Sequence, residues 1–127
     1  RLETEPRKER ENEITYQESN TTHKIKEYIN KNYIKADLNL TSIAQVFGFN
    51  PSYLSRLFKV ESGMNLSDYL LKCRIEKAME YAKKGSLMYI TAKMVGIPDP
   101  NYFGKCFKKY TGESYSDFIK DKCDQNL

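Results

Sequence analysis

The chain resembles itself at a period of about 48 residues, and this internal repeat limits the folds open to it. Ala44 and Gly48 recur as Ala92 and Gly96, at an offset of 48 residues. The offset becomes 49 for six further pairs, which are Tyr53 and Tyr102, Phe58 and Phe107, Lys59 and Lys108, Gly63 and Gly112, Ser67 and Ser116, and Asp68 and Asp117. We therefore expect two copies of one structural unit, with one extra residue in the second turn.

Each copy predicts a short helix, a glycine turn and a second helix. The second helix opens with Asn50-Pro51 in one copy and with Asp99-Pro100 in the other. Asn or Asp at the cap, followed by Pro at the first helical position, is a strong start signal. A small alanine in the first helix lets the two helices cross closely. The pattern therefore predicts two helix-turn-helix units.

The remaining segments also show helical periodicity. Apolar residues line one face from His23 to Tyr33, and residues 66–84 contain neither Gly nor Pro. No strand pattern is present, so we expect an all-α fold with subdomains at 23–65 and 86–127 and a linker helix at 66–85. About 18 helical residues span ~27 Å, comparable to the ~34 Å between successive major grooves.

The outward faces of the two second helices are alike. In the first copy, the residues expected to turn inward are Leu54, Leu57 and Phe58, and those left outward are Ser52, Ser55, Arg56 and Lys59. In the second copy, the inward residues are Phe103, Cys106 and Phe107, and the outward ones are Asn101, Gly104, Lys105 and Lys108. Small residues let a helix enter the major groove, while Arg, Lys and Asn can reach base edges. Lys59, Lys108 and Lys109 lie one turn later, where phosphates are expected. A single polar face is usually only solvated, but its repetition favours DNA binding.

Charge separates residues 1–22 from the rest of the chain. This segment carries four basic and six acidic side chains and few apolar ones, which predicts a polar linker or tail. The remaining residues have a net charge of +6, compatible with a polyanionic partner. Because the chain begins at Arg1, we expect it to continue upstream into another domain. With no long apolar run, a cytoplasmic protein without membrane contact is expected.

Metal, cofactor and redox chemistry find little support in the sequence. Cys73, Cys106 and Cys123 lie far apart, and His23 is the only histidine, so no zinc spacing can be assembled. We expect reduced thiols, with Cys106 as a small core residue and Cys123 near a frayed end. No metal or cofactor is predicted.

Three motifs together resemble the AraC/XylS-type transcription regulators over roughly residues 23–121. They are Pro51-Ser-Tyr-Leu-Ser-Arg-Leu-Phe-Lys59, Arg74-Ile-Glu-Lys-Ala78 and the run from Asp99 to Gly112. The resemblance implies seven helices, binding to double-stranded promoter DNA and activation through RNA polymerase. By position, it makes Ser52, Ser55, Arg56, Asn101, Gly104 and Lys105 the base-reading candidates. The segment 1–22 resembles the connector in response regulators with a receiver domain, although another sensor domain could equally precede it, and the full-length protein could be a dimer.

The second unit departs from the family pattern in its first helix. Thr91 lies at a position where the family usually has a large apolar residue, and Ile90 lies at a position that is usually exposed. Leu87 occupies the usual cap position, although the neighbouring Ser86 could cap the helix in its place. We therefore expect looser packing in this unit. Gly104 offers no side chain to a base, so specificity should depend more on the first unit.

Two other functions compete with promoter binding. A helical protein-interaction module would dock RNA polymerase or another partner with little DNA contact, but the outward faces are too polar for that. An enzyme is the poorest alternative, because the sequence has no phosphate-binding glycine loop and no evident nucleophile with a partner base.

Overall fold

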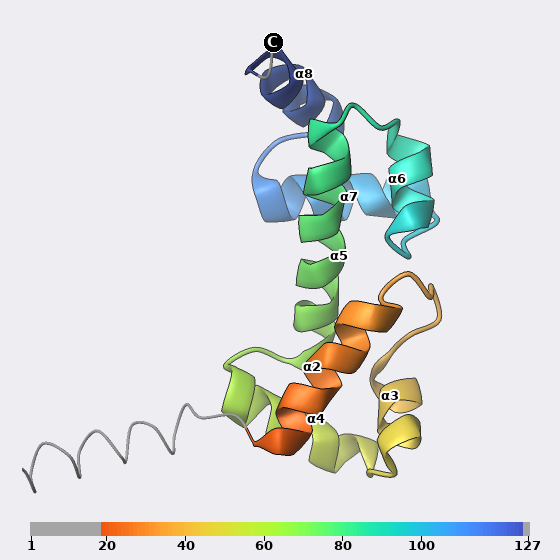
Figure 1. Ribbon diagram of the computed structural model, residues 1–127, viewed down its shortest axis with the longest axis vertical. Helices are drawn as coiled ribbons and strands as arrows, with labels where there is room; N and C mark the ends of the chain where they lie inside the picture. The colour runs from red at the N-terminus through yellow and green to blue at the C-terminus, as the bar shows by residue number, and fades with distance from the viewer. Residues whose placement is uncertain (1–18, 126–127) are drawn as a thin grey trace, which may run out of the picture. The chain divides into compact units, whose positions relative to one another are not determined.

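The computed structural model describes residues 19–125 and, within that range, contains seven helices and no strand (Figure 1). The helices are α2 (Asn20–Asn32), α3 (Leu40–Phe47), α4 (Pro51–Ser62), α5 (Leu66–Lys83), α6 (Met88–Met94), α7 (Pro100–Thr111) and α8 (Tyr115–Gln125). The all-α prediction is confirmed. Most of the predicted linker, residues 1–18, and the side chain of Cys123 lie outside the described residues.

The chain forms two compact units. Unit 1 contains the described residues up to Ile29 together with Asn39–Tyr69. Unit 2 contains Asn30–Leu38 and the residues from Leu70 onward. The segment between α2 and α3 therefore packs with unit 2, although the helix on each side of it belongs largely to unit 1.

In unit 1, α3 and α4 form a helix-turn-helix in which the two helices cross steeply (Figure 1). Asn39 caps α3 in a reciprocal capping box with Ser42, and Gly48 ends the helix at a φ of 74°. The Asn50 side chain then accepts hydrogen bonds from the backbone of α4 at Ser52 and Tyr53. Local capping thus sets both ends of the turn.

The core of unit 1 is the set of apolar side chains that the sequence periodicity placed inward. Its fully buried members are Ile25, Ile29, Ile43, Ala44, Leu54 and Phe58. Phe58 packs edge-on against Tyr69, with ring centroids 5.5 Å apart. The Lys26 ammonium lies over the same two rings, at 6.0 Å and 5.3 Å from their centroids. This packing holds the inner face of α4 and leaves its other face to solvent.

Unit 2 repeats the same construction with α6 and α7, which also cross steeply (Figure 1). Asp99 caps α7 with Pro100 at its start, and Gly112 ends it at a φ of 93°. The aromatic rings of Phe103, Phe107, Tyr115 and Phe118 form one cluster with centroid separations of 5.1–5.8 Å. As predicted, Cys106 is a buried core residue, and Cys73 and Cys106 are free thiols.

The expectation of looser packing in unit 2 depended partly on Thr91, a polar residue where the family pattern has a large apolar one. Thr91 is fully buried, and its hydroxyl lies 2.7 Å from the Tyr115 hydroxyl, which in turn donates to the Ser86 carbonyl. The polar group therefore has a partner inside the core and carries no unpaired-burial penalty. Leu87 occupies the cap of α6 and makes no side-chain capping hydrogen bond.

Candidate nucleic-acid interface

The outward face of α4 is formed by the residues that the sequence predicted for it. Ser52, Arg56 and Lys59 are exposed, and Ser55 is half-buried. Leu54 and Phe58 on the opposite side are fully buried, while Leu57 is half-buried rather than fully inward. The side chains of Ser52, Ser55, Arg56 and Lys59, spaced at i, i+3, i+4 and i+7, lie along one side of the helix.

The outward face of α7 has the same character. Asn101, Lys105, Lys108 and Lys109 are exposed and Gly104 is half-buried, whereas Phe103, Cys106 and Phe107 are buried. Only the Met88 methyl group lies near the space that a Gly104 side chain would fill, at 3.6 Å. Gly104 thus lowers the helix surface without being required by the packing.

A hollow of about 340 Å³ lies beside this face of α7. It is lined by Met88, Pro100, Asn101, Gly104, Lys105, Lys108, Ser114, Tyr115 and Ser116. Ser114 accepts a hydrogen bond from the Asp117 backbone amide at 3.1 Å and so caps the start of α8. The hollow places two lysines and an asparagine next to a helix start, a combination suited to a phosphate backbone.

The cations of these two faces are available to a partner. In the part of the chain that the structure describes, neither Arg56 nor Lys105 takes part in an ion pair, and the same holds for Lys59, Lys108 and Lys109. Neither Arg56 nor Lys105 is buried. Since no acidic neighbour within those residues neutralises them, both helices present net positive charge outward.

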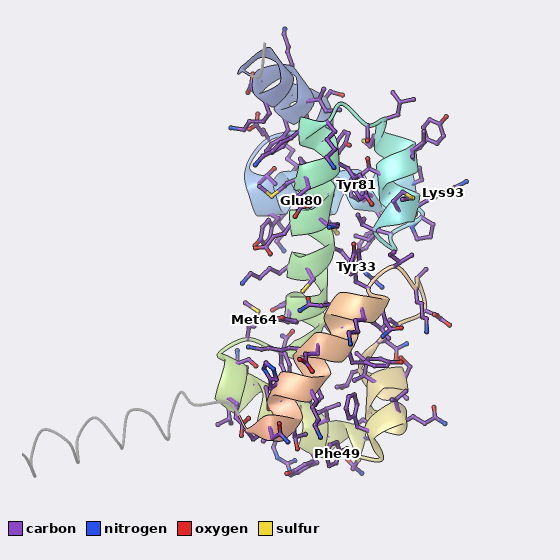
Figure 2. All side chains as sticks on the ribbon, in the orientation of Figure 1. Tyr33, Phe49, Met64, Glu80, Tyr81 and Lys93 are labelled. Atoms are coloured by element: carbon purple, nitrogen blue, oxygen red, sulfur yellow. The ribbon has the colours of Figure 1, made fainter. Side chains whose placement is uncertain are left out.

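Two exposed tyrosines on these helices belong to the sequence repeat but were not predicted as site residues. Tyr53 on α4 and Tyr102 on α7 are equivalent in the repeat and are 46% and 56% exposed. Tyr53 packs against Phe49, which Figure 2 labels in the turn after α3, with ring centroids 5.6 Å apart. A hydrogen bond with the Cys106 side chain raises the pKa of Tyr102. Their recurrence at the same offset as Lys59 and Lys108 is the signal that could have added them to the candidate site residues.

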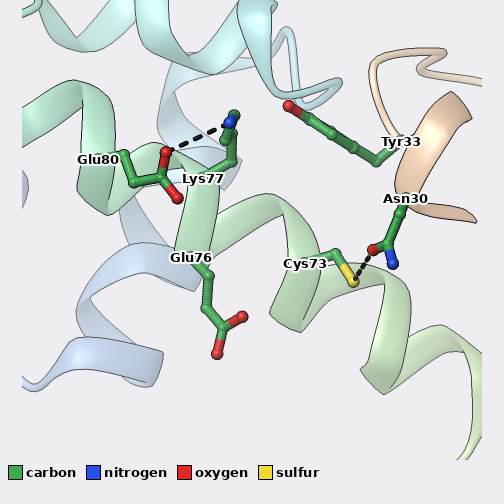
Figure 3. Close-up of a pocket in the computed structure, with 6 residues that line it drawn as sticks. All are labelled: Asn30, Tyr33, Cys73, Glu76, Lys77 and Glu80. Carbon is green, nitrogen blue, oxygen red and sulfur yellow. Dashed lines mark hydrogen bonds and ion pairs between the residues drawn. The ribbon is translucent and has the colours of Figure 1, made fainter.

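Another hollow in unit 2, of about 250 Å³, has a different chemistry (Figure 3). It is lined by Asn30, Tyr33, Cys73, Glu76, Lys77 and Glu80. The Lys77 ammonium donates to Glu80 at 3.2 Å, and the Cys73 thiol donates to the Asn30 carbonyl oxygen at 3.4 Å. The lining carries two carboxylates and a single lysine, and that lysine is already paired with Glu80. Its charge is therefore unfavourable for phosphate, and the hollow lies outside the proposed nucleic-acid interface.

The residues that the structure describes offer neither a metal site nor a membrane span. They contain no group of three or more His, Cys, Asp or Glu side chains placed to hold a metal ion. In residues 19–125, none of the helices has the length and apolar character needed to cross a membrane.

Comparison with known proteins connects this geometry to a family. A family model described as a helix-turn-helix domain matches residues 34–121. The HTH-type transcriptional regulator YijO of Escherichia coli is 36% identical over 95 residues, which are 74% of this chain and 33% of that protein. The arabinose operon regulatory protein of Escherichia coli is 31% identical over 93 residues, covering 72% of this chain and 32% of that protein. The chain thus spans about a third of each of these relatives.

Solved structures support the same assignment. The C-terminal domain of AraT, a response regulator from Geobacillus stearothermophilus, superposes with a TM-score of 0.80 at 32% identity. The match covers 83% of this chain and 88% of that domain. The relatives are transcription regulators, and none of these matches supports a protein-interaction module that avoids DNA. The chain belongs to the AraC/XylS-type family of transcription regulators, as a DNA-binding domain with two helix-turn-helix units.

Proposed function

We propose that the exposed faces of α4 and α7 read base edges in two major-groove segments of promoter DNA. Ser52, Ser55 and Arg56 on α4 and Asn101, Gly104 and Lys105 on α7 would contact the bases. Lys59, Lys108 and Lys109 would contact phosphates. The observation that carries this proposal is the doubling: the same small and cationic face is exposed on two repeat-related helices, each behind its own glycine turn.

The chemistry of these side chains assigns a role to each. Arg56 can donate two hydrogen bonds to the O6 and N7 atoms of a guanine, and Asn101 can pair with the N6 and N7 atoms of an adenine. Lys105 can reach a guanine edge as a point donor. Ser52, Ser55 and Gly104 are small and let the helix backbone approach the groove floor. The lysines one turn later neutralise phosphates and hold the register.

The intact protein would use this domain as its output. We infer a cytoplasmic bacterial regulator that is not an enzyme and that recruits RNA polymerase as an activator. An upstream receiver or other sensor domain would control it, and the full-length protein would form a dimer. The upstream domain is supported by the response regulator AraT, whose C-terminal domain this chain resembles, and by the bacterial regulators that are longer than the chain.

Single-base scanning of a bound site tests the assigned roles. The site would be selected from randomised duplexes with the purified chain, and affinities would then be measured for every single-base change. Arg56→Ala should weaken binding to the preferred site by about 1 to 3 kcal/mol and flatten the preference at one position in the half read by α4. Lys105→Ala should flatten a position in the other half.

Lys24→Ala is the matched control, because Lys24 is an exposed cation on α2 outside the proposed face. It should lower affinity slightly for all sites and leave the preferences unchanged. If Arg56→Ala and Lys105→Ala kept the wild-type preference at every position, the assignment of these helices to base reading would be wrong.

A further inference from the structure

Arg74 on α5 is a buried cation whose partners are main-chain oxygens. Only 9% of its surface is exposed. Its Nε donates to the Tyr33 carbonyl at 2.9 Å, and its Nη2 donates to the Lys35 carbonyl at 2.7 Å. Burial lowers the pKa of Arg74, but a guanidinium remains charged at every physiological pH. The planar guanidinium therefore donates to two carbonyls of the segment Asn30–Leu38, and this segment packs in unit 2.

The same carbonyl oxygen meets the turn of the second helix-turn-helix. Gly96 lies in that turn with a φ of 88°. A Cβ atom on Gly96 would come within 2.2 Å of the Tyr33 oxygen and within 3.0 Å of the Arg74 Nε. The backbone of the turn thus lies directly against the pair formed by Arg74 and Tyr33, whose side chain is labelled in Figure 2.

This contact is close to the start of α7 in the chain. Gly96 precedes the cap residue Asp99 by three positions, and Pro100 begins the helix. The Arg74 charge also acts on the Tyr102 phenol in the first turn of α7. The guanidinium therefore interacts with both the turn that leads into α7 and the first turn of α7 itself.

We propose that Arg74 is a positioning residue for base reading by α7. Its guanidinium fixes the Tyr33 and Lys35 carbonyls, and the Gly96 turn that leads into α7 packs against the Tyr33 carbonyl. This inference rests on the proposed function of α7. Hydrogen bonds to base edges need donor–acceptor distances of about 2.7–3.2 Å. A small displacement of these carbonyls would move the turn and α7 with it. Discrimination between bases would therefore be lost while the domain is still folded.

Base discrimination in the two half-sites of the selected duplex tests this role. Arg74→Met should reduce the discrimination in the half read by α7 about tenfold, which corresponds to losing one good base contact. The half read by α4 should keep its preferences. Arg74→Lys should give a smaller loss in the same half, because an ammonium cannot reproduce the two-pronged donor geometry.

The ratio of affinities separates positioning from folding. A smaller folded fraction lowers binding to every sequence by the same factor, so it leaves the ratio between preferred and substituted sites unchanged. Lys72→Met is the control, since it removes a positive charge from the same helix. Lys72→Met should lower the affinity for every duplex by the same factor. It should leave the base preferences in both half-sites unchanged.

Two outcomes would overturn the inference. The first is an Arg74 variant that binds DNA and keeps the wild-type ratio of affinities between preferred and substituted sites in the half read by α7. The second is an equal loss of base preference in both half-sites. Should Arg74→Met fail to fold, Arg74→Lys and Arg74→Gln decide the question by the same ratio. If Lys105→Ala also left the α7 half unchanged, the proposed base-reading role of α7 would fail instead.

Discussion

Glu61 shows how one carboxylate at the end of α4 stabilises the start of α2. It accepts hydrogen bonds from the Ser19 backbone amide and the Ser19 hydroxyl, both at 2.8 Å, and from the buried Thr22 hydroxyl. The Ser19 hydroxyl oxygen itself caps α2 by accepting from the Thr22 backbone amide at 3.2 Å, and the Glu61 carboxylate, supplied by another helix, fixes both residues in that arrangement. Partial burial acts to raise the pKa of Glu61, but the hydrogen bonds outweigh it and the pKa is lowered.

A lowered pKa makes stability depend on pH. The stabilisation by Glu61 should be complete well above pH 4.3, the usual pKa of an unfolded glutamate, and should be lost as the pH falls through the lower folded value. Urea unfolding from neutral pH down to about pH 3 should show Glu61→Gln less stable than wild type at neutral pH, with the difference shrinking on acidification. A difference that stays constant with pH would contradict this reading, and exposed Asp37→Asn is the control.

Residue roles were predictable where they depend on local pattern. The exposure of Arg56 and Lys105 follows from the 3.6-residue period of their helices, and so does the burial of Cys106. Glu61 and Arg74 were not predictable in their roles, because their hydrogen bonds join residues 39 to 42 positions apart. Only the folded chain brings such groups together.

At the scale of elements, the two glycine turns look alike in sequence but differ in their surroundings. Gly48 and Gly96 both have a positive φ, at 74° and 88°. A Cβ atom on Gly48 would meet nothing within 4 Å, whereas on Gly96 it would collide with the Tyr33 carbonyl. The repeat predicts equal turns, and the packing of unit 2 makes them unequal.

Alanine at each turn should show this difference. Gly48→Ala should cost about 1 to 2 kcal/mol of unfolding free energy, the strain of a left-handed backbone. Gly96→Ala should cost about 2 to 5 kcal/mol, because overpacking against a fixed backbone adds to that strain. Chemical denaturation of the two variants measures both values. Equal losses would mean that the turn of unit 2 can move away from Tyr33 at little cost.

At the scale of the whole molecule, affinity for DNA should depend strongly on charge. The proposed phosphate contacts come from both units, Lys59 in unit 1 and Lys108 and Lys109 in unit 2. Each neutralised phosphate releases counterions when the complex forms. The salt dependence of binding therefore counts phosphate contacts independently of sequence preference.

The slope of log affinity against log salt tests these lysines. Each of Lys59→Ala, Lys108→Ala and Lys109→Ala should reduce the magnitude of the slope by about 0.9, measured by titration between about 50 and 200 mM salt. Preferences among bases should stay as in wild type, because phosphate contacts carry no sequence information. Lys24→Ala should change the slope much less than these three variants do, and an equal slope in all four variants would remove the three lysines from the phosphate contacts.

The sequence by itself determined the helices, the caps of α3, α4 and α7, the two turns and the polar faces of α4 and α7, because these follow from periodicity and backbone chemistry over a few residues. Only the tertiary structure decided which polar groups are paired inside each unit. Thr91 meets Tyr115 across 24 positions, and Arg74 meets Tyr33 across 41. It also decided that Asn30–Leu38 packs in unit 2. The physical reason is that a buried polar group needs a hydrogen-bond partner, and the partner is fixed by three-dimensional packing rather than by neighbours along the chain.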